Sequence, residues 1–414
     1  MKALVRRALG PDRTAAAATV ASSALAQFRR WRRHRPRVSF DSPLRLHKFS
    51  AGPGHTFFGY HDVTPFSGDD TRLLAIHTTN RATDPARVGW FAAADPDAGF
   101  HAAAETATWC WQQGCRLQWH PARPGALFVF NGLFDGAFGS EVHDLNAATV
   151  RRHGRPVYAI SPDGASALSL NFARLHRLRP GYGYANLADD TEPDPAPAND
   201  GLWQIDLGDG KSDLLHSLAD LARLAPAPSM RGAVHYLNHL SYSPGGKRLL
   251  FFHLWRGAGA RYSRICTADA GGANLAVLSP HRASHFCWLD DDEVLAFTID
   301  EHGHGGYRRF RPGQTGSARV GGDELAVDGH PMLSPRGGPV VIDTYPDAVS
   351  ERRLSLLDLA TGARMPLASF YSPPWITGAR RCDLHPRWNR GGDRIAVDSA
   401  HGGRRALCVV DLQR

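Results

Sequence analysis

The sequence predicts an all-β fold, namely a seven-bladed β-propeller with a basic N-terminal extension. The first observation behind this prediction is a hairpin pattern, two alternating apolar runs joined by a short turn, which recurs seven times after residue 57. The second is that further strand-like runs, such as RLSLLDL (353–359) and RALCVVDL (405–412), separate the hairpins. Four strands per unit and seven units make a propeller, which grows by repetition and so accommodates 414 residues in one domain.

The seven hairpin turns are built from the small and acidic residues that reverse a chain. They read FSGDD (66–70), ARPG (122–125), SPDG (161–164), SPGG (243–246), LDDD (289–292), SPRG (334–337) and NRGG (389–392). A long loop and a predicted helix, SDLLHSLADLARL (212–224), stretch the third unit. We expect a strand from residues 43–49 to pair with the last unit and close the ring, which leaves few bare edges.

The domain organisation follows from the charge. Residues 1–40 contain ten Lys or Arg and one Asp, so they contribute +9 to the net charge of +8, and the rest of the chain sums to −1. The predicted domains are therefore a basic leader, disordered or helical, over residues 1–42 and the propeller over residues 43–414. A near-neutral body argues against a nucleic-acid partner. The leader fits a solvated tail or a peripheral contact with an anionic membrane, and a cleaved secretion signal is the minority interpretation.

Cysteine usage favours a cytoplasmic, possibly membrane-associated protein. The six cysteines include no C-x-x-C pair and no dense framework, which is typical of reduced core residues. No stretch approaches the roughly 20 apolar residues of a membrane span. The chain has no P-loop, no dinucleotide fingerprint and no G-x-S-x-G elbow, which disfavours nucleotide-dependent transferases and serine hydrolases.

A histidine stands four residues before the turn in four successive hairpins. Because the first strand of a blade starts on the face where the second strand ends, these side chains should ring one mouth of the central channel, the usual place for a pocket. The four are His239, His285, His330 and His385. The second strands end on the same face with Asn171, His253, Asp343 and Asp398, and the loops that follow contain Arg174, His176, Arg177, Arg179, Tyr182, Tyr184, Tyr345 and His401.

Each of these signals also has a structural interpretation. Propeller histidines often tie neighbouring blades together through hydrogen bonds. The long segment after Asn171 could be a surface flap whose arginines pair with its own acidic half, DDTEPD (189–194). The run HGHGG (302–306) could ligate a metal, although a solvated turn tip is the simpler interpretation.

Several motifs resemble known propellers. The apolar-SPDG-apolar hairpin looks like the repeat of TolB-type propellers, and HPMLSPRG and HPRWNRGG are similar to hairpins of bacterial oligogalacturonate lyases. The runs LNFARLHRLRPGYGY, HYLNHLSYSPGGKRLLFFH, DTYPD and RCDLHPRW resemble propellers of bacterial surface-polysaccharide (exopolysaccharide) clusters. The lyase resemblance implies a metal held by three histidines and a glutamine, but the Gln-x-x-His-x-His run of that family is missing here.

The predicted chemistry is metal-assisted β-elimination on a uronate-containing oligo- or polysaccharide. Converging imidazoles with a carboxylate suit Mn²⁺ or Zn²⁺, and the predicted ligands are His330, His385, His285 and Asp343. Elimination also needs a base, an acid for the leaving oxygen, and cations for the sugar carboxylate. The candidate catalytic residues are His239, His253, His176, Tyr182 and Tyr184, and the candidate substrate-binding residues are Arg174, Arg177, Arg179 and Tyr345.

Two other function classes stay open. One is a non-catalytic propeller that binds a polysaccharide or a biosynthetic partner. The other is a glycoside hydrolase, which needs two opposed carboxylates at the mouth, and Asp343 and Asp398 could supply them.

Overall fold

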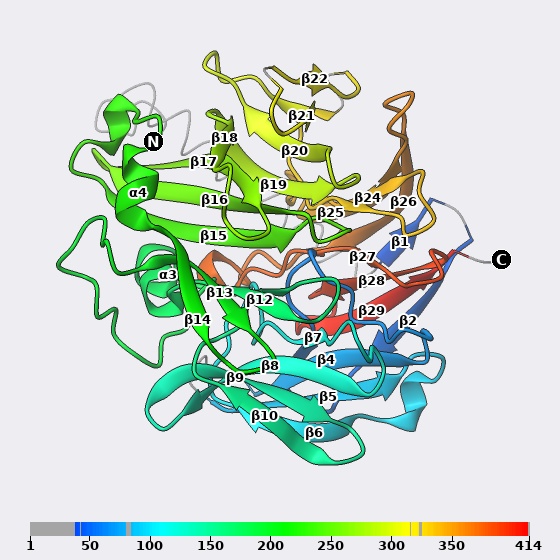
Figure 1. Ribbon diagram of the computed structural model, residues 1–414. Helices are drawn as coiled ribbons and strands as arrows, with labels where there is room; N and C mark the ends of the chain where they lie inside the picture. The colour runs from blue at the N-terminus through cyan, green and yellow to red at the C-terminus, as the bar shows by residue number, and fades with distance from the viewer. Residues whose placement is uncertain (1–37, 42, 80–83, 315, 323–324, 413–414) are drawn as a thin grey trace, which may run out of the picture.

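The computed structural model describes residues 38–412 apart from 42, 80–83, 315 and 323–324, and its seven antiparallel sheets stand around a common centre (Figure 1). The fold is therefore the predicted all-β, seven-bladed propeller. Each sheet has four strands, except for one sheet of five. Most of the basic leader, including its predicted membrane contact, lies outside the described residues.

The first four blades follow one another along the chain. Blade one contains β3 (His55–Phe57), β4 (Arg72–Thr78), β5 (Ala86–Ala92) and β6 (His101–Thr106). Blade two contains β7 (Gln118–Trp119), β8 (Leu127–Phe134), β9 (Ala137–Asp144) and β10 (Ala148–His153). Blade three contains β11 (Ala159–Ile160), β12 (Ser166–Ser169), β13 (Gly201–Asp206) and β14 (Ser212–Ser217). Blade four contains β15 (Val234–Tyr242), β16 (Arg248–Gly257), β17 (Ala260–Asp269) and β18 (Ala276–Ser279).

The last three blades include the two N-terminal strands. Blade five contains β19 (Arg282–Trp288), β20 (Val294–Ile299), β21 (Gly305–Phe310) and β22 (Ala318–Arg319). Blade six contains β23 (Met332–Leu333), β24 (Val340–Ile342), β25 (Glu351–Leu357), β26 (Arg364–Tyr371) and β1 (Val38–Phe40). Blade seven contains β27 (Arg387–Trp388), β28 (Arg394–Ser399), β29 (Ala406–Asp411) and β2 (Arg45–Phe49). The short helices are α3 (Phe172–Leu178), α4 (Leu218–Arg223) and the 3₁₀ turns η1 (Pro96–Ala98), η2 (Pro228–Met230) and η4 (Gly378–Arg380).

The N-terminal strand β2 closes the ring. It pairs antiparallel with β29, from Arg45 opposite Asp411 to Phe49 opposite Leu407, as expected for residues 43–49. In Figure 1 the blue β2 lies beside the red β28 and β29. The strand β1 pairs with β26 and adds a fifth strand to blade six, although the sequence placed residues 38–40 in the leader. Both strands cover sheet edges that would otherwise expose unpaired backbone groups.

The predicted helix over residues 212–224 is half strand. Residues 212–217 pair with β13 as the outer strand of blade three, and the helix α4 begins only after Ser217. The Ser217 hydroxyl accepts a hydrogen bond from the Asp220 amide at 3.0 Å, which caps the helix. The apolar spacing of SDLLHSLADLARL suits a helix, but ladder bonds to a neighbouring strand override that local preference.

The recurrent turn residues are explained by their contacts. The Ser67 and Ser161 hydroxyls each accept the amide five residues on, at 2.9 Å, and Ser243 does so at 3.2 Å. In blade seven Asn389 replaces serine, and its Oδ1 accepts from the Arg394 amide at 2.8 Å. Glycines close these turns at positive φ, for example Gly246 at 72°, a conformation that costs other residues strain.

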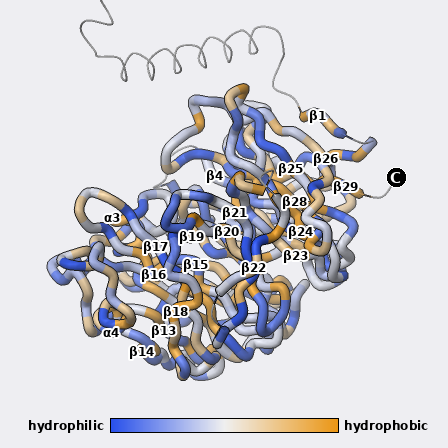
Figure 2. The backbone as a smooth tube through the Cα atoms, turned by 90° about the horizontal axis from the view of Figure 1, so that it is seen from above, coloured by the Kyte–Doolittle hydropathy of each residue, from blue (hydrophilic) through white to orange (hydrophobic). Residues whose placement is uncertain are grey.

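The core lies between the blades. Because each sheet is covered on both faces, its inner strands read as continuous apolar runs, and nearly all of β16 (RLLFFHLWRG) is buried. Figure 2 shows apolar stretches along the strands and hydrophilic ones in the loops. We call the end of the channel where the innermost strands begin the strand-start face, and the opposite end the hairpin-turn face. Within the described residues, no helix is long and apolar enough to cross a membrane.

Candidate functional site

Five imidazoles from five blades gather around one phenol at the channel. This histidine cluster consists of His61, His239, His285, His330, His385 and Tyr60. The ring centroids of His285 and His330 lie 4.1 Å apart, those of His330 and His385 4.4 Å apart, and those of His239 and His285 6.4 Å apart. The four histidines that the repeat places at one mouth therefore do converge.

Irregular strand starts aim these side chains into the channel. The ladder shifts register between Asn238 and Ser241 and again between Ala283 and Phe286, which makes a bulge around each of the histidines there. His239 and His385 adopt positive φ angles of 55° and 46°. Bulges and positive φ values re-aim a side chain at the cost of backbone strain, and such features concentrate at functional sites.

Tyr60 and His61 are members that the sequence analysis missed. The Tyr60 ring lies 4.8 Å from His385 and 5.0 Å from His239, and His61 lies 5.2 Å from His330. Both belong to the irregular segment between β3 and the first hairpin turn. His61 stands six residues before Ser67, the equivalent of Ser243, so the four-residue spacing could not find it.

Hydrogen bonds fix the orientation of four imidazoles through their Nδ1 atoms. His285 Nδ1 contacts Asp328 Oδ1 at 2.9 Å, and His330 Nδ1 contacts Asp343 Oδ1 at 2.8 Å. His385 Nδ1 and His61 Nδ1 contact the carbonyl oxygens of Gly59 at 2.7 Å and Pro331 at 3.0 Å. Since these oxygens only accept, each ring donates from Nδ1–H, and its lone pair lies on Nε2.

The freed nitrogen atoms have the properties of metal ligands. The Nε2 atoms of His285, His330 and His385 are buried and have no hydrogen-bond partner among the described residues. A buried lone pair without a partner costs free energy, so a ligand is expected to satisfy it. Metal-binding histidines in proteins are held in this way, with the second nitrogen donating to a carboxylate or carbonyl.

Burial favours the neutral form of His61, His239, His285 and His385. Desolvation lowers the pKa of His61, His239 and His385 well below the ordinary value of 6.5, and the neighbouring histidines and arginines lower it further. For His285 burial also lowers the pKa, although Asp328 opposes the shift. Neutral imidazole is the form that binds a metal or accepts a proton.

Asp383 is a carboxylate of the site that the sequence analysis did not single out. It forms a group with His330 and His385, in which one ligand atom of each residue lies within 4.8 Å of the others. Arg352 and Arg381 form ion pairs with the Asp383 carboxylate at 2.8 and 2.7 Å. Burial raises the pKa of Asp383, but these two arginines outweigh it and hold the pKa far below its ordinary value. The spacing D-x-H in RCDLHPRW was the available signal.

The predicted metal ligand Asp343 accepts hydrogen bonds from two of the histidines, His330 and His385. Its Oδ1 accepts from the His330 amide and ring, and its Oδ2 accepts from the His385 amide at 3.2 Å. Asp398 accepts the amides of Phe58 and Gly59 at 3.1 Å and forms an ion pair with Arg387 at 3.0 Å. Both carboxylates are fully buried and occupied, so Asp343 supports the ligands instead of joining them, and the pair lacks the geometry of a hydrolase.

Three of the predicted residues line the cluster on the strand-start side, together with Arg381. The Arg179 guanidinium lies 3.8 Å from the Tyr182 ring centroid, and Tyr182 lies 6.0 Å from His239. Arg381 donates to the Tyr182 hydroxyl at 2.6 Å. Tyr345 lies 5.9 Å from His330 and faces Arg352 and Arg381. This side of the cluster is therefore rich in guanidinium and phenol groups.

Arg174, Arg177 and His176 do not reach the cluster. Arg174 is buried in the long loop, where it donates to the carbonyls of His235, Thr191, Asp194 and Pro195. Arg177 pairs with Asp189 at 2.8 Å. Arg174 and Arg177 thus pair within the flap, as the structural interpretation predicts, whereas Arg179 faces Tyr182. The helix α3 carries all three residues, and the Asn171 side chain caps it by accepting from the Arg174 amide at 2.9 Å.

Tyr184 and His253 are core residues. Tyr184 stacks on Phe172 and bonds Asn131 through its hydroxyl at 2.8 Å. His253 is fully buried between His235, at 2.8 Å, and Arg264, at 3.2 Å. Neither is placed to act as acid or base at the cluster. The two histidines of HGHGG, His302 and His304, are exposed.

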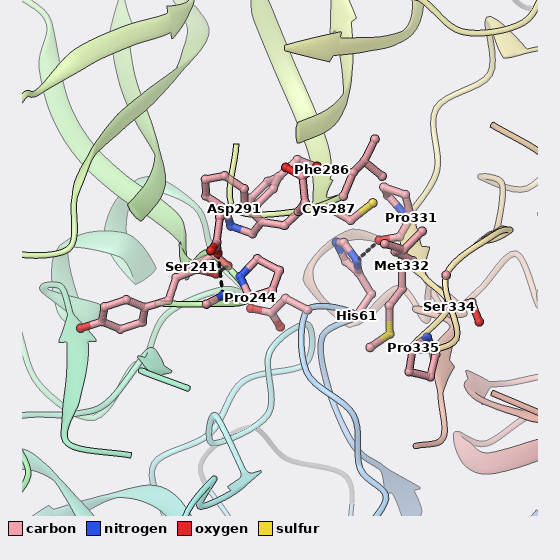
Figure 3. Close-up of a pocket in the computed structure, with 18 residues that line it drawn as sticks. His61, Ser241, Pro244, Phe286, Cys287, Asp291, Pro331, Met332, Ser334 and Pro335 are labelled. Carbon is pink, nitrogen blue, oxygen red and sulfur yellow. Dashed lines mark hydrogen bonds between the residues drawn. The ribbon is translucent and has the colours of Figure 1, made fainter. Parts of the chain in front are cut away.

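A cavity opens on the hairpin-turn face, the side opposite to the strand-start mouth at which a pocket was expected. It measures about 680 Å³ and reaches His61 from the turns of blades four, five and six. Figure 3 shows His61 with its bond to Pro331 at the cavity wall, below Phe286 and Cys287. None of the described lining residues is Lys or Arg, whereas Asp62, Asp290 and Asp291 are present.

Solved structures share this architecture. The chain is similar to oligogalacturonate lyase from Vibrio parahaemolyticus, with 14% identity, a TM-score of 0.58, and coverage of 92% of this chain and 99% of that one. It is also similar to an oligogalacturonate lyase in complex with manganese, with 14% identity, a TM-score of 0.62, and coverage of 92% and 98%. TolB from Acinetobacter baumannii matches more remotely, with 13% identity over 89% and 97% of the chains and a TM-score of 0.39. No protein-family model and no curated protein matches.

Proposed function

We propose that the protein is a metal-assisted lyase that cleaves a uronate-containing oligo- or polysaccharide by β-elimination. The observation that carries the proposal is the set of buried Nε2 atoms of His285, His330 and His385, whose Nδ1 atoms are already held. The oligogalacturonate-lyase neighbours support the same reaction class at the level of the fold.

The donor set fits a divalent cation of the Mn²⁺ or Zn²⁺ type. His330, His385 and Asp383 would hold it, since two imidazole nitrogens and a carboxylate oxygen suit such ions. Asp383 already pairs with two arginines, so its share of the binding would be weaker than that of the imidazoles. When bound, the cation would supply Lewis acidity toward the substrate carboxylate.

The arginines supply the rest of the anion site. Arg179 and Arg381 flank Tyr182 on the strand-start side, where they can pair with the sugar carboxylate. Their positive charge stabilises the carbanion that forms when the adjacent proton leaves. The described residues that line the cavity on the hairpin-turn face include no Lys or Arg to pair with a sugar carboxylate, so we assign the acidic saccharide to the strand-start face.

We assign proton removal to His285, which the sequence predicted as a metal ligand, because the described group whose ligand atoms lie within 4.8 Å of one another consists of His330, Asp383 and His385. Asp328 holds its Nδ1–H at 2.9 Å, which leaves Nε2 as a base, and its pKa lies below the ordinary value because of burial. His239 is a poorer base than predicted, because its Nε2 already accepts a hydrogen bond from the side-chain Nδ2 of Asn238 at 3.2 Å. The proton beside the carboxylate moves to His285, a carbon–carbon double bond forms, and the glycosidic oxygen one carbon further on leaves. The Tyr182 hydroxyl oxygen accepts a hydrogen bond from Arg381, so the hydroxyl proton of Tyr182 can be donated to the leaving glycosidic oxygen.

The test combines metal analysis with product analysis. A lyase forms a 4,5-unsaturated product that absorbs in the ultraviolet, whereas a hydrolase releases reducing ends without that absorbance. We expect H330A and H385A to lose both the metal and turnover, and H285A to keep the metal and lose turnover. Turnover that is unchanged in H330A and H385A would contradict the proposal.

A non-catalytic binding propeller is the second candidate. The observation that favours it is burial, because His285, His330 and His385 are only 1–2% exposed. On this alternative the cluster is a structural metal site, and the arginine-rich mouth only binds an acidic saccharide. Metal at one equivalent and saccharide binding without any bond cleavage would identify it.

A further inference from the structure

A further pocket lies on the strand-start face, and its Arg380 directly precedes Arg381, which donates to Tyr182. It has a volume of about 210 Å³, and its walls include Trp111, Trp375, Arg380 and Arg404. Every wall segment is a loop or a strand start on the face to which the cluster residues also belong. Pockets for drug-sized ligands measure about 300–1,000 Å³, so this one suits a single sugar ring.

The pocket combines an exposed indole with cationic groups. Trp375 is 59% exposed, the largest value among the exposed large apolar side chains of the described chain. Trp111 forms a buried wall under the Arg380 guanidinium, which lies 5.3 Å from its ring. Arg404 is exposed at the rim. A flat apolar ring beside guanidinium groups matches a sugar ring that bears a carboxylate.

One tethered loop joins this pocket to the cluster. The loop runs from Trp375 through Arg380 to Arg381, whose Nε donates to Asp383 at 2.7 Å. Gln112 donates to the Ala379 and Arg381 carbonyls at 3.2 and 2.8 Å, and Arg405 donates to the Arg380 carbonyl at 2.9 Å. These buried donors fix the loop backbone, so the position of the pocket relative to the cluster is also fixed.

We propose that this pocket, the Trp375 subsite, binds the uronate ring next to the one held at the histidine cluster. The ring stacks on Trp375, and its carboxylate faces Arg380 and Arg404. The inference rests on the proposed function, and it adds that the sugar next to the reacting uronate also carries a carboxylate and has its own binding pocket. It also implies that chain length sets affinity, because a monosaccharide can occupy only one of the two positions.

The experiment measures binding of end-labelled oligogalacturonates and oligoglucuronates of one, two and four residues by fluorescence anisotropy. We expect W375A to weaken binding of the two- and four-residue chains about tenfold, equivalent to about 1.4 kcal/mol, and to leave monosaccharide binding unchanged. R404A should act in the same direction and become less effective at high salt. M365A is the matched control, because Met365 is 55% exposed on the outer part of blade six.

The outcomes separate the two proposals. An equal loss for all chain lengths in W375A, or no loss for any, overturns the subsite. If neither acidic series binds the unaltered protein, both proposals fall. Length-dependent binding that W375A abolishes, without any unsaturated product from the unaltered protein, supports the subsite and overturns only the lyase chemistry.

Discussion

His330 and Asp343 are joined by two hydrogen bonds at one oxygen, since Asp343 Oδ1 accepts both the His330 amide and its ring Nδ1 at 2.8 Å. A carboxylate directly after the second strand of blade six therefore fixes a histidine that precedes the first strand of the same blade. The other oxygen accepts the His385 amide, so one buried charge positions two neighbouring blades.

Replacing Asp343 by Asn should weaken metal binding. The amide keeps the shape but removes the charge that holds His330, and loss of such supporting partners typically costs 10- to 100-fold in affinity. We expect the Mn²⁺ dissociation constant of D343N, measured by calorimetry, to rise by about that factor. The control is D398N, which removes an equally buried charge that contacts Phe58, Gly59 and Arg387. An equal affinity loss in both variants would contradict a specific role for Asp343.

Arg174 and Arg179, five residues apart, should respond in opposite ways to replacement by Ala. Arg174 is buried with its donors committed to the flap, so R174A leaves several carbonyls without partners and should cost about 3 kcal/mol of stability or more. R179A should leave the melting temperature nearly unchanged and weaken binding of acidic saccharides. Thermal melts and binding isotherms on the two variants check this, and a destabilised R179A would contradict it.

Acid should destabilise the protein through the pair His235 and His253. Burial lowers the pKa of His235 to about 4 and that of His253 well below its ordinary value. Below about pH 6.5 the two histidines take up protons in the unfolded chain but not in the folded protein. Their contribution to the free energy of unfolding is therefore fully present above that pH and is lost as the pH falls toward 4. Each histidine contributes a slope of up to about 1.4 kcal/mol per pH unit. Urea unfolding between pH 7.5 and 5 should show a slope that is about one proton shallower in H253N, and parallel profiles would refute this.

Truncation should separate β1 from β2. A chain that begins at residue 43 loses only the added edge strand of blade six and should remain folded. A chain that begins at residue 51 also loses β2, which leaves the edge of β29 without a partner strand. It also loses the buried Phe49 side chain, whose burial contributes about 1.5–3 kcal/mol to stability. We expect the shorter chain to aggregate on size-exclusion chromatography, and a monodisperse one would show that closure is dispensable.

The hairpin repeat made the fold predictable because each turn carries its own chemistry. The Ser161 hydroxyl accepts a backbone amide within the turn, and Gly164 adopts the positive φ that the turn needs. Because these contacts are local, the motif alone indicates where the chain of a blade reverses. The helix over residues 212–217 was a wrong prediction, because only the pairing with β13 distinguishes that segment from the helix that follows.

The candidate site was predictable only where residues follow the repeat. His239, His285, His330 and His385 share one position in four blades, and the position alone places them together. His61 and Asp383 lie in irregular segments, where no periodicity indicates direction. Arg174 and Arg177 were predicted to bind substrate, but both pair with Asp189. The sequence alone does not distinguish an arginine that faces the channel from one that pairs within its own loop.

The pairing of Arg45 with Asp411 has a consequence for biosynthesis. The ribosome makes β2 before any of the seven hairpins, yet its partner β29 emerges only after blades one to six have been translated. Until then β2 has no neighbouring strand, so a truncated transcript or a protease cut that removes β29 also leaves β2 unpaired. The two strands therefore depend on each other, and the ring closes only in molecules that contain both.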